Sequence, residues 1–145
     1  MIWIWAGLAA GAGLAAQAAI NSRLGRELGN PALATLASFL TGIVLVATYC
    51  VVVRAQLPSA AALLRVPAWA WLGGSLGAAY VATIIVVTPK IGVGTMSGLA
   101  VGGQMATAVV LDHFGALGLE RHPVTPARIA GVVLVVAGVF LLKRF

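Results

Sequence analysis

The chain has 145 residues, of which 61% are hydrophobic and 8% charged, and its net charge at pH 7 is +6. Soluble domains carry about 25% charged residues, so this composition excludes a water-soluble fold. The positive charge does not indicate a nucleic-acid partner, because Lys and Arg stand singly or in pairs at the ends of apolar runs. The single cysteine, Cys50, excludes an intrachain disulfide. We therefore expect an all-α integral membrane protein in a lipid bilayer.

Apolar runs long enough to cross a bilayer recur along the chain. We expect transmembrane helices at residues 2–20, 32–53, 68–88, 91–111 and 127–142, in a single five-helix domain over residues 1–145. A signal peptide is the competing interpretation of the first run, and we favour a span because no Lys or Arg precedes it. A loop is expected from Asn21 to Pro31, and Ser59 is expected to cap a short interfacial helix.

Small residues recur every four positions in the first, third and fourth predicted helices. The glycines concerned are Gly7, Gly11, Gly73, Gly77, Gly94, Gly98 and Gly102. In water such segments would be poor helices, but in lipid the backbone has no other hydrogen-bond partner, so the helix forms. The spacing places the glycines on one stripe of each helix, and we expect these stripes to let neighbouring helices approach closely.

Few polar side chains lie within the spans, and no Asp or Glu lies in their interior. An amide in lipid needs partners, which a bound solute or a neighbouring helix supplies. Gln17 and Gln104 are therefore candidate substrate-binding residues, with a hydrogen bond between helices as the alternative. Asn21 is a weaker candidate, because it would also serve as a cap of the first helix. Tyr80 is a candidate cavity residue, with a packed or interfacial tyrosine as the alternative.

Asp112 follows the fourth span and is the only acid close to a span, which makes it a candidate for ion coupling. A carboxylate at a helix C-terminus is slightly unfavourable, so the alternative is a surface residue paired with Arg121 or Arg128. Asp112, His113 and His122 match no standard zinc spacing, and no metal site is expected. We find no cofactor or enzyme motif, because the glycines follow helix-packing spacing rather than phosphate-binding spacing.

Five spans place the two chain ends on opposite sides of the membrane. Four basic residues then lie on the N-terminal side: Arg54, Arg65, Arg121 and Arg128. Five lie on the other side: Arg23, Arg26, Lys90, Lys143 and Arg144. This balance leaves the positive-inside rule without a preference, so insertion in both directions, and an antiparallel homodimer, are compatible with the sequence.

Several segments together resemble one transporter family. They are residues 17–21 (QAAIN), the run GGSLGAAYV, the run GGQMATAVVLDHFG, and the ending PARIAGVVLVVAGVFLLKRF. The chain resembles the YdcZ-like, five-helix branch of the drug/metabolite transporter superfamily, related to EamA-type transporters. This resemblance implies a multi-pass protein of the bacterial inner membrane. It also implies half of a ten-helix inverted-repeat architecture, completed by a second copy or by a sister five-helix chain.

The resemblance further implies secondary transport of a small organic solute or cation by alternating access. The related small multidrug resistance proteins carry an essential glutamate in their first helix, where this chain offers Gln17. Exchange of protons for a cationic drug at one carboxylate is therefore not expected. The alternative function is a non-transporting membrane subunit that stabilises a partner chain.

Overall fold

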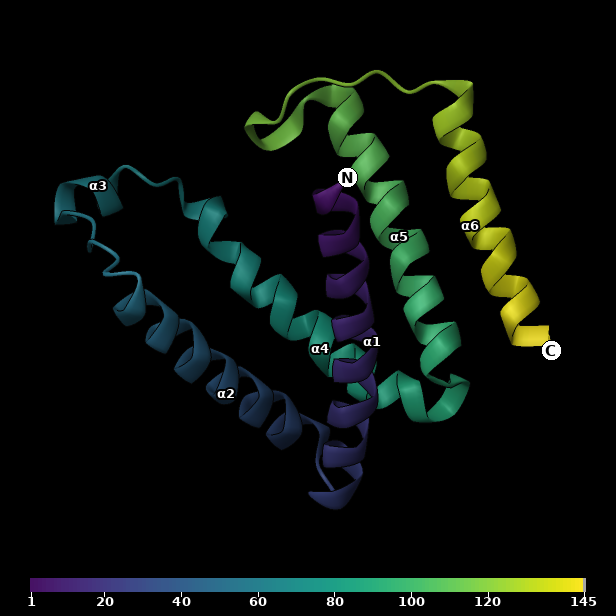
Figure 1. Ribbon diagram of the computed structural model, residues 1–145, viewed down its shortest axis with the longest axis horizontal. Coiled ribbons are helices and arrows are strands. Elements are labelled where there is room, and N and C mark those ends of the chain that lie inside the picture. The colour runs from purple at the N-terminus through teal and green to yellow at the C-terminus, as the bar shows by residue number, and fades with distance from the viewer. Residues whose placement is uncertain (145) are drawn as a thin grey trace. The chain divides into compact units, whose positions relative to one another are not determined.

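The structure is a computed structural model that describes residues 1–144, and this part of the chain is helical, without strands (Figure 1). The longer helices are α1 (Ile2–Glu27), α2 (Pro31–Val52), α4 (Leu72–Ile91), α5 (Val93–Phe114) and α6 (Pro126–Arg144). The short elements are α3 (Ala60–Leu64), η1 (Ala68–Trp71) and η2 (Ala116–Gly118). Five helical stretches, with η1 and α4 counted as one, are long and apolar enough to cross a membrane. The predicted all-α class and five spans are confirmed.

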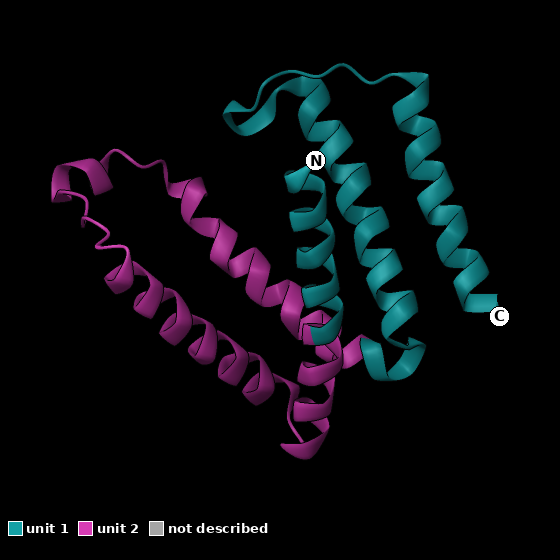
Figure 2. Ribbon diagram, in the orientation of Figure 1, with its two compact units in different colours: residues 1–16, 88–145 teal, residues 17–87 magenta. Residues whose placement is uncertain are grey.

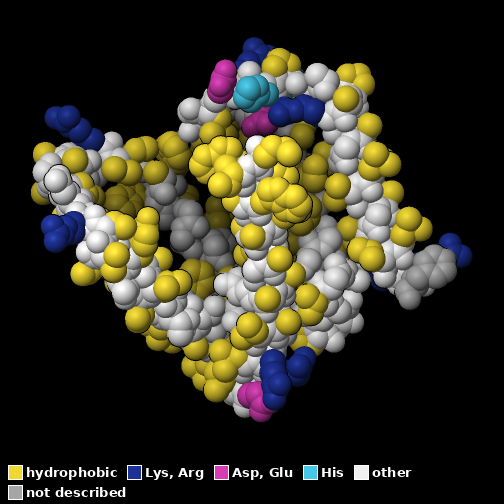
Figure 3. Space-filling view, viewed as in Figure 1, with side chains coloured by type: hydrophobic (Ala, Val, Ile, Leu, Met, Phe, Trp, Pro, Cys, Tyr) yellow, Lys and Arg dark blue, Asp and Glu magenta, His cyan; other side chains and the backbone are white. Residues whose placement is uncertain are grey.

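The surface of these helices is mostly hydrophobic. Side chains such as Leu45 and Leu134 are exposed, and Figure 3 shows hydrophobic side chains along the helices with charged ones near helix ends. In water, apolar surface of this extent would drive association, whereas in a bilayer it faces acyl chains. The distribution therefore fits a protein whose solvent is lipid.

The helical contacts divide the chain into two compact units, coloured separately in Figure 2. Unit 1 comprises residues 1–16 and 88–145, and unit 2 comprises residues 17–87. Each unit is described by itself below. The expected single domain over the whole chain stays a prediction.

Asn30 and Ser59 cap the helices that follow them, and the sequence predicted this role for Ser59. The Asn30 side chain accepts a hydrogen bond from the backbone N–H of Ala32 at 2.9 Å, and Pro31 opens α2. The Ser59 hydroxyl accepts one from the backbone N–H of Ala62 at 3.2 Å, which starts α3. Asn and Ser suit these positions because their short side chains satisfy amides that the first helical turn leaves free.

The predicted loop from Asn21 to Pro31 is wrong, because α1 continues to Glu27. The extra residues include Arg23 and Glu27, good helix formers whose side chains form an ion pair at 3.7 Å. The chain leaves the helical conformation only near Gly29, whose φ of +62° suits a residue without a side chain. Asn21 is consequently an interior helix residue and not a cap.

The core of unit 2 lies where the second half of α1, α2 and α4 meet. Ala34, Val81 and Ile85 are buried there, with Leu24, Phe39 and Tyr80 packed around them. Gly25 brings α1 against α4 so closely that an added Cβ would stand 2.6 Å from Cγ2 of Ile85. Small residues at this crossing therefore set the distance between the two helices.

In unit 1, α5 and α6 pack antiparallel. An added Cβ at Gly98 would lie 2.6 Å from a methyl of Val139, and one at Gly102 would lie 3.4 Å from Val136. The residue that is later in α5 contacts the residue that is earlier in α6, so the two helices run antiparallel. The chain reverses after Gly115, whose φ of +58° ends α5 in the left-handed conformation.

Candidate functional site

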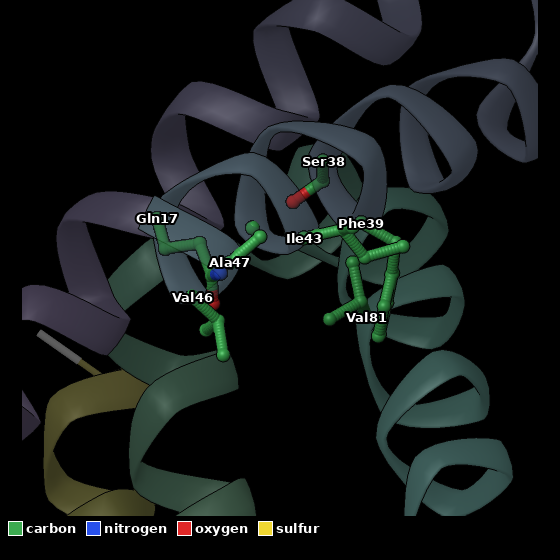
Figure 4. Close-up of a pocket in the computed structure, with 8 residues that line it drawn as sticks. Gln17, Ser38, Phe39, Ile43, Val46, Ala47 and Val81 are labelled. Carbon is green, nitrogen blue, oxygen red and sulfur yellow. The ribbon is translucent and has the colours of Figure 1, made fainter. Parts of the chain in front are cut away.

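Unit 2 contains a pocket of about 550 Å³ beside its helical core (Figure 4). Its lining residues come from α1, α2 and α4. They are Gln17, Ser38, Phe39, Gly42, Ile43, Val46, Ala47 and Val81. The volume lies within the range of small-molecule sites, and two polar side chains in an apolar lining are the usual composition of such sites.

Gln17 is the polar residue that α1 contributes to the pocket. Figure 4 shows it on one side of the pocket, with Phe39 and Val81 on the other. Its side chain is half-buried, and within residues 1–144 no hydrogen bond engages its amide. The amide therefore retains both a donor and an acceptor for a solute.

Ser38 is the second polar residue of the lining, and Asn21 holds it from behind. The Asn21 amide nitrogen donates to the Ser38 hydroxyl oxygen at 3.0 Å. Asn21 is 6% exposed and does not line the pocket. Within the described chain the Ser38 hydroxyl hydrogen has no acceptor, so Ser38 can donate it to a solute. The geometry makes Asn21 a positioning residue for Ser38.

The other two sequence candidates are not among the residues that line this pocket. Tyr80 is half-buried against the core cluster of Ala34, Val81 and Ile85 and is not part of the lining. Gln104 lies on α5 in unit 1 and is exposed. Neither position tests a role in substrate binding, and both roles stay predictions.

The predicted glycine stripes have different surroundings along their length. Gly98 and Gly102 contact α6. A Cβ added at Gly77 would lie 3.9 Å from the Phe39 ring. The remaining four predicted positions, Gly7, Gly11, Gly73 and Gly94, have open space around them. Sequence reasoning missed Gly25, although it stands four residues after Asn21 and thus on the same side of α1.

Asp112 forms an ion pair in the turn between α5 and α6. Its carboxylate accepts a hydrogen bond from Nη2 of Arg128 at 3.0 Å, which confirms one of its two predicted partners. Arg128 also donates to the backbone carbonyl of His122 at 3.1 Å, and the His122 N–H donates to the Asp112 carbonyl at 2.8 Å. The carboxylate is thus engaged in closing the loop, and its coupling role stays a prediction.

His113 takes part in the same turn through its ring. Its Nδ1 accepts a hydrogen bond from the Val124 N–H at 3.2 Å, which requires that nitrogen to be unprotonated. Arg121 donates through Nε to the His113 carbonyl at 3.0 Å. These bonds give His113 a structural function in the loop.

A family model described as "Putative inner membrane exporter, YdcZ" matches residues 2–141, nearly the whole chain. The chain belongs to the DMT_YdcZ family. It is accordingly a multi-pass protein of the inner membrane, in contact with the lipid bilayer. The predicted resemblance to the YdcZ-like branch is confirmed. No curated protein and no solved structure matches the chain.

Proposed function

We propose that this member of the DMT_YdcZ family is a secondary transporter that exports a small organic solute through the pocket of unit 2. The observation that carries the proposal is the unpaired amide of Gln17 in a pocket whose lining is apolar apart from Gln17 and Ser38. A polar side chain within a membrane span is costly unless it finds a partner, and polar residues in spans often mark substrate pathways.

The depth of the pocket along the helices supports the same function. Gly42 lies eleven residues after Pro31, the first residue of α2, which is roughly 16 Å along the helix axis. This distance is about half of a hydrocarbon core of roughly 30 Å. A site near the membrane centre is where transporters built from inverted repeats hold their substrates.

The transporter would work as an antiparallel pair of chains, either two copies or one copy and a sister chain. The nearly even division of basic residues, four against five, supports insertion in both directions. The open surroundings of Gly7, Gly11 and Gly94 offer small-residue surfaces for a second chain. In such a pair, the two halves would rock about each other and expose the pocket to either side.

Transport is tested first in liposomes that contain only this chain. Currents on a solid-supported membrane, complemented by tracer uptake for electroneutral exchange, are recorded for cations, amines, zwitterions, sugars and neutral aromatic alcohols. The Gln17→Ala variant should abolish the transport of any solute that the wild-type protein moves. The matched Gly131→Leu variant, at a position in open space that does not line the pocket, should retain it. Absence of transport with every solute, also with a co-expressed sister chain, would favour the alternative of a non-transporting subunit.

Dual insertion is tested separately with reporter fusions at the C-terminus. Cytoplasmic and periplasmic reporters should both be active. Adding two lysines to the segment between α2 and α3, residues 53–59, would then shift the population toward one orientation. A wild-type chain with a single orientation would contradict a homodimer of opposite insertions and leave a sister chain as the second half.

A further inference from the structure

The pocket in unit 2 has no ionisable side chain in its lining. Gln17 and Ser38 are the polar members, and Phe39, Ile43, Val46 and Val81 form most of the apolar wall. A charged solute that leaves water for such surroundings loses its hydration without gaining a counter-charge. Binding of an ion at this position is therefore strongly unfavourable.

No carboxylate of unit 2 is placed to offset a cation there. The sequence has three acidic residues, Glu27, Asp112 and Glu120. Glu27 is the last residue of α1, ten positions after Gln17 and roughly 15 Å away along the helix. Asp112 and Glu120 belong to unit 1, and the Asp112 carboxylate is paired with Arg128.

The nearest basic residue of α1 is equally unsuited to an anion. Arg23 follows Gln17 by six positions, or roughly 9 Å along the helix. Its side chain is 77% exposed and paired with Glu27. An anion in the pocket would thus meet apolar walls and two neutral polar groups.

Those two neutral groups define what the pocket can recognise. The Gln17 amide offers a donor and an acceptor, and the Ser38 hydroxyl, held by Asn21, offers a donor. We infer that the pocket binds uncharged, largely apolar solutes that carry a hydroxyl or amide group. Their apolar body lies against Phe39 and Val81, and their polar group bonds Gln17 or Ser38. That such a solute is also the transported substrate rests on the proposed function.

The test measures binding to the full chain in lipid nanodiscs, without any transport step. Three probes of closely similar shape are compared: biphenyl-4-ylmethanol, 4-methylbiphenyl, and biphenyl-4-ylmethylammonium. Each is radiolabelled, and partition into protein-free nanodiscs is subtracted. The alcohol should bind at least ten times more tightly than the ammonium cation. Gln17→Leu should weaken the binding of the alcohol about five- to tenfold, because the alcohol loses a hydrogen bond. The affinity for 4-methylbiphenyl, which has no such bond to lose, should change by less than about twofold.

A second variant locates the site independently of hydrogen bonding. Gly42 lines the pocket, and a Cβ added there meets nothing within 4 Å, so Gly42→Leu occupies pocket volume without clashing at its base. It should weaken both uncharged probes at least tenfold. Gly131→Leu, also in open space but outside the pocket, should leave both unchanged. Size-exclusion profiles and helical circular dichroism establish that both variants are folded.

Two results would overturn the inference. The first is Gly42→Leu-sensitive binding of the cation as tight as that of the alcohol. The second is binding of the uncharged probes that neither Gly42→Leu nor Gln17→Leu alters. The proposed function has a separate outcome: selective binding without transport in liposomes rejects the transporter and retains the binding site. Transport of a cation that Gly42→Leu does not affect rejects the pocket and retains the transporter.

Discussion

Asn21 of α1 donates a hydrogen bond to Ser38 of α2 across 3.0 Å, and the acceptor is a residue of the pocket lining. Hydrogen bonds between membrane helices contribute about 1 kcal/mol. Asn21→Ala should therefore lower the free energy of unfolding by about this amount, because it removes the bond and leaves Ser38 unsupported. Denaturation in mixed detergent micelles measures the loss. The double variant with Ser38→Ala should cost clearly less than the sum of the two single losses.

The control for this bond is Thr48→Ala, which changes a residue of α2, the helix that carries Ser38. The Thr48 hydroxyl donates to the Val44 carbonyl of its own helix at 2.8 Å, so its removal breaks no contact between helices. We expect a change within about 0.5 kcal/mol. Additive losses for Asn21→Ala and Ser38→Ala would contradict the direct coupling of these two residues.

The close approach of α1 and α4 predicts that Gly25→Ala is destabilising. The added methyl would stand 2.6 Å from Cγ2 of Ile85, a buried, β-branched side chain with little freedom to rotate. We expect a loss of about 1–3 kcal/mol in unfolding experiments, the usual cost of overpacking. The second substitution Ile85→Ala should recover part of it by opening space.

Gly13→Ala is the matched control in the same helix, because a Cβ at Gly13 meets nothing within 4 Å. It should leave stability unchanged or raise it slightly, since alanine is the better helix former. If Gly25→Ala proved as harmless as Gly13→Ala, the α1–α4 contact at Ile85 would be refuted.

The sequence predicted the features that depend on local signals, and it missed those that depend on contacts between helices. Apolar runs and a capping residue such as Ser59 are local signals, and they sufficed to predict the five spans and the start of α3. The end of α1 was missed, because the sequence prediction ended the helix before Asn21, whereas α1 continues to Glu27. Its Ser38 partner is a contact between helices, which local patterns do not encode.

The lining of the pocket likewise contains residues that the sequence identified and residues that it did not. Gln17 was identifiable as a polar residue in an apolar span, since an amide in lipid requires partners. Phe39 and Val81 were not, because an apolar side chain has the same sequence signature whether it faces lipid, a core or a cavity. Likewise, the stripe spacing identified Gly94 and Gly98 alike, although only Gly98 contacts another helix within the described chain.

This difference between Gly94 and Gly98 gives the next prediction. An added Cβ at Gly98 would meet three atoms of Val139 at 2.6 to 3.4 Å, and Val139 is itself buried. Gly98→Ala should lower the free energy of unfolding by about 1–3 kcal/mol, whereas Gly94→Ala, in open space, should not. Combining Gly98→Ala with Val139→Ala should restore most of the loss. Equal effects at both glycines would contradict the α5–α6 register.

The ion pair between Asp112 and Arg128 joins two charges that each sit at the unfavourable end of a helix. Asp112 lies two residues before the end of α5, where the dipole favours cations, and Arg128 is the third residue of α6, where it favours anions. The pair also closes the loop, with side chains only 29% and 37% exposed, respectively. Exchanging the two charges should therefore keep the attraction and improve both helix ends.

We expect each single change, Asp112→Arg or Arg128→Asp, to destabilise the purified protein, because it places like charges at the contact. The double variant should be more stable than either single variant and should regain the stability that each single change loses. The lost bond from Arg128 to the His122 carbonyl offsets part of the gain from the helix dipoles, each about 0.3–1 kcal/mol. The same exchange at Arg23 and Glu27, an exposed pair, should change stability by less than about 0.5 kcal/mol. A double variant less stable than both single variants would mean that the Arg128–His122 bond outweighs the ion pair in holding the α5–α6 turn.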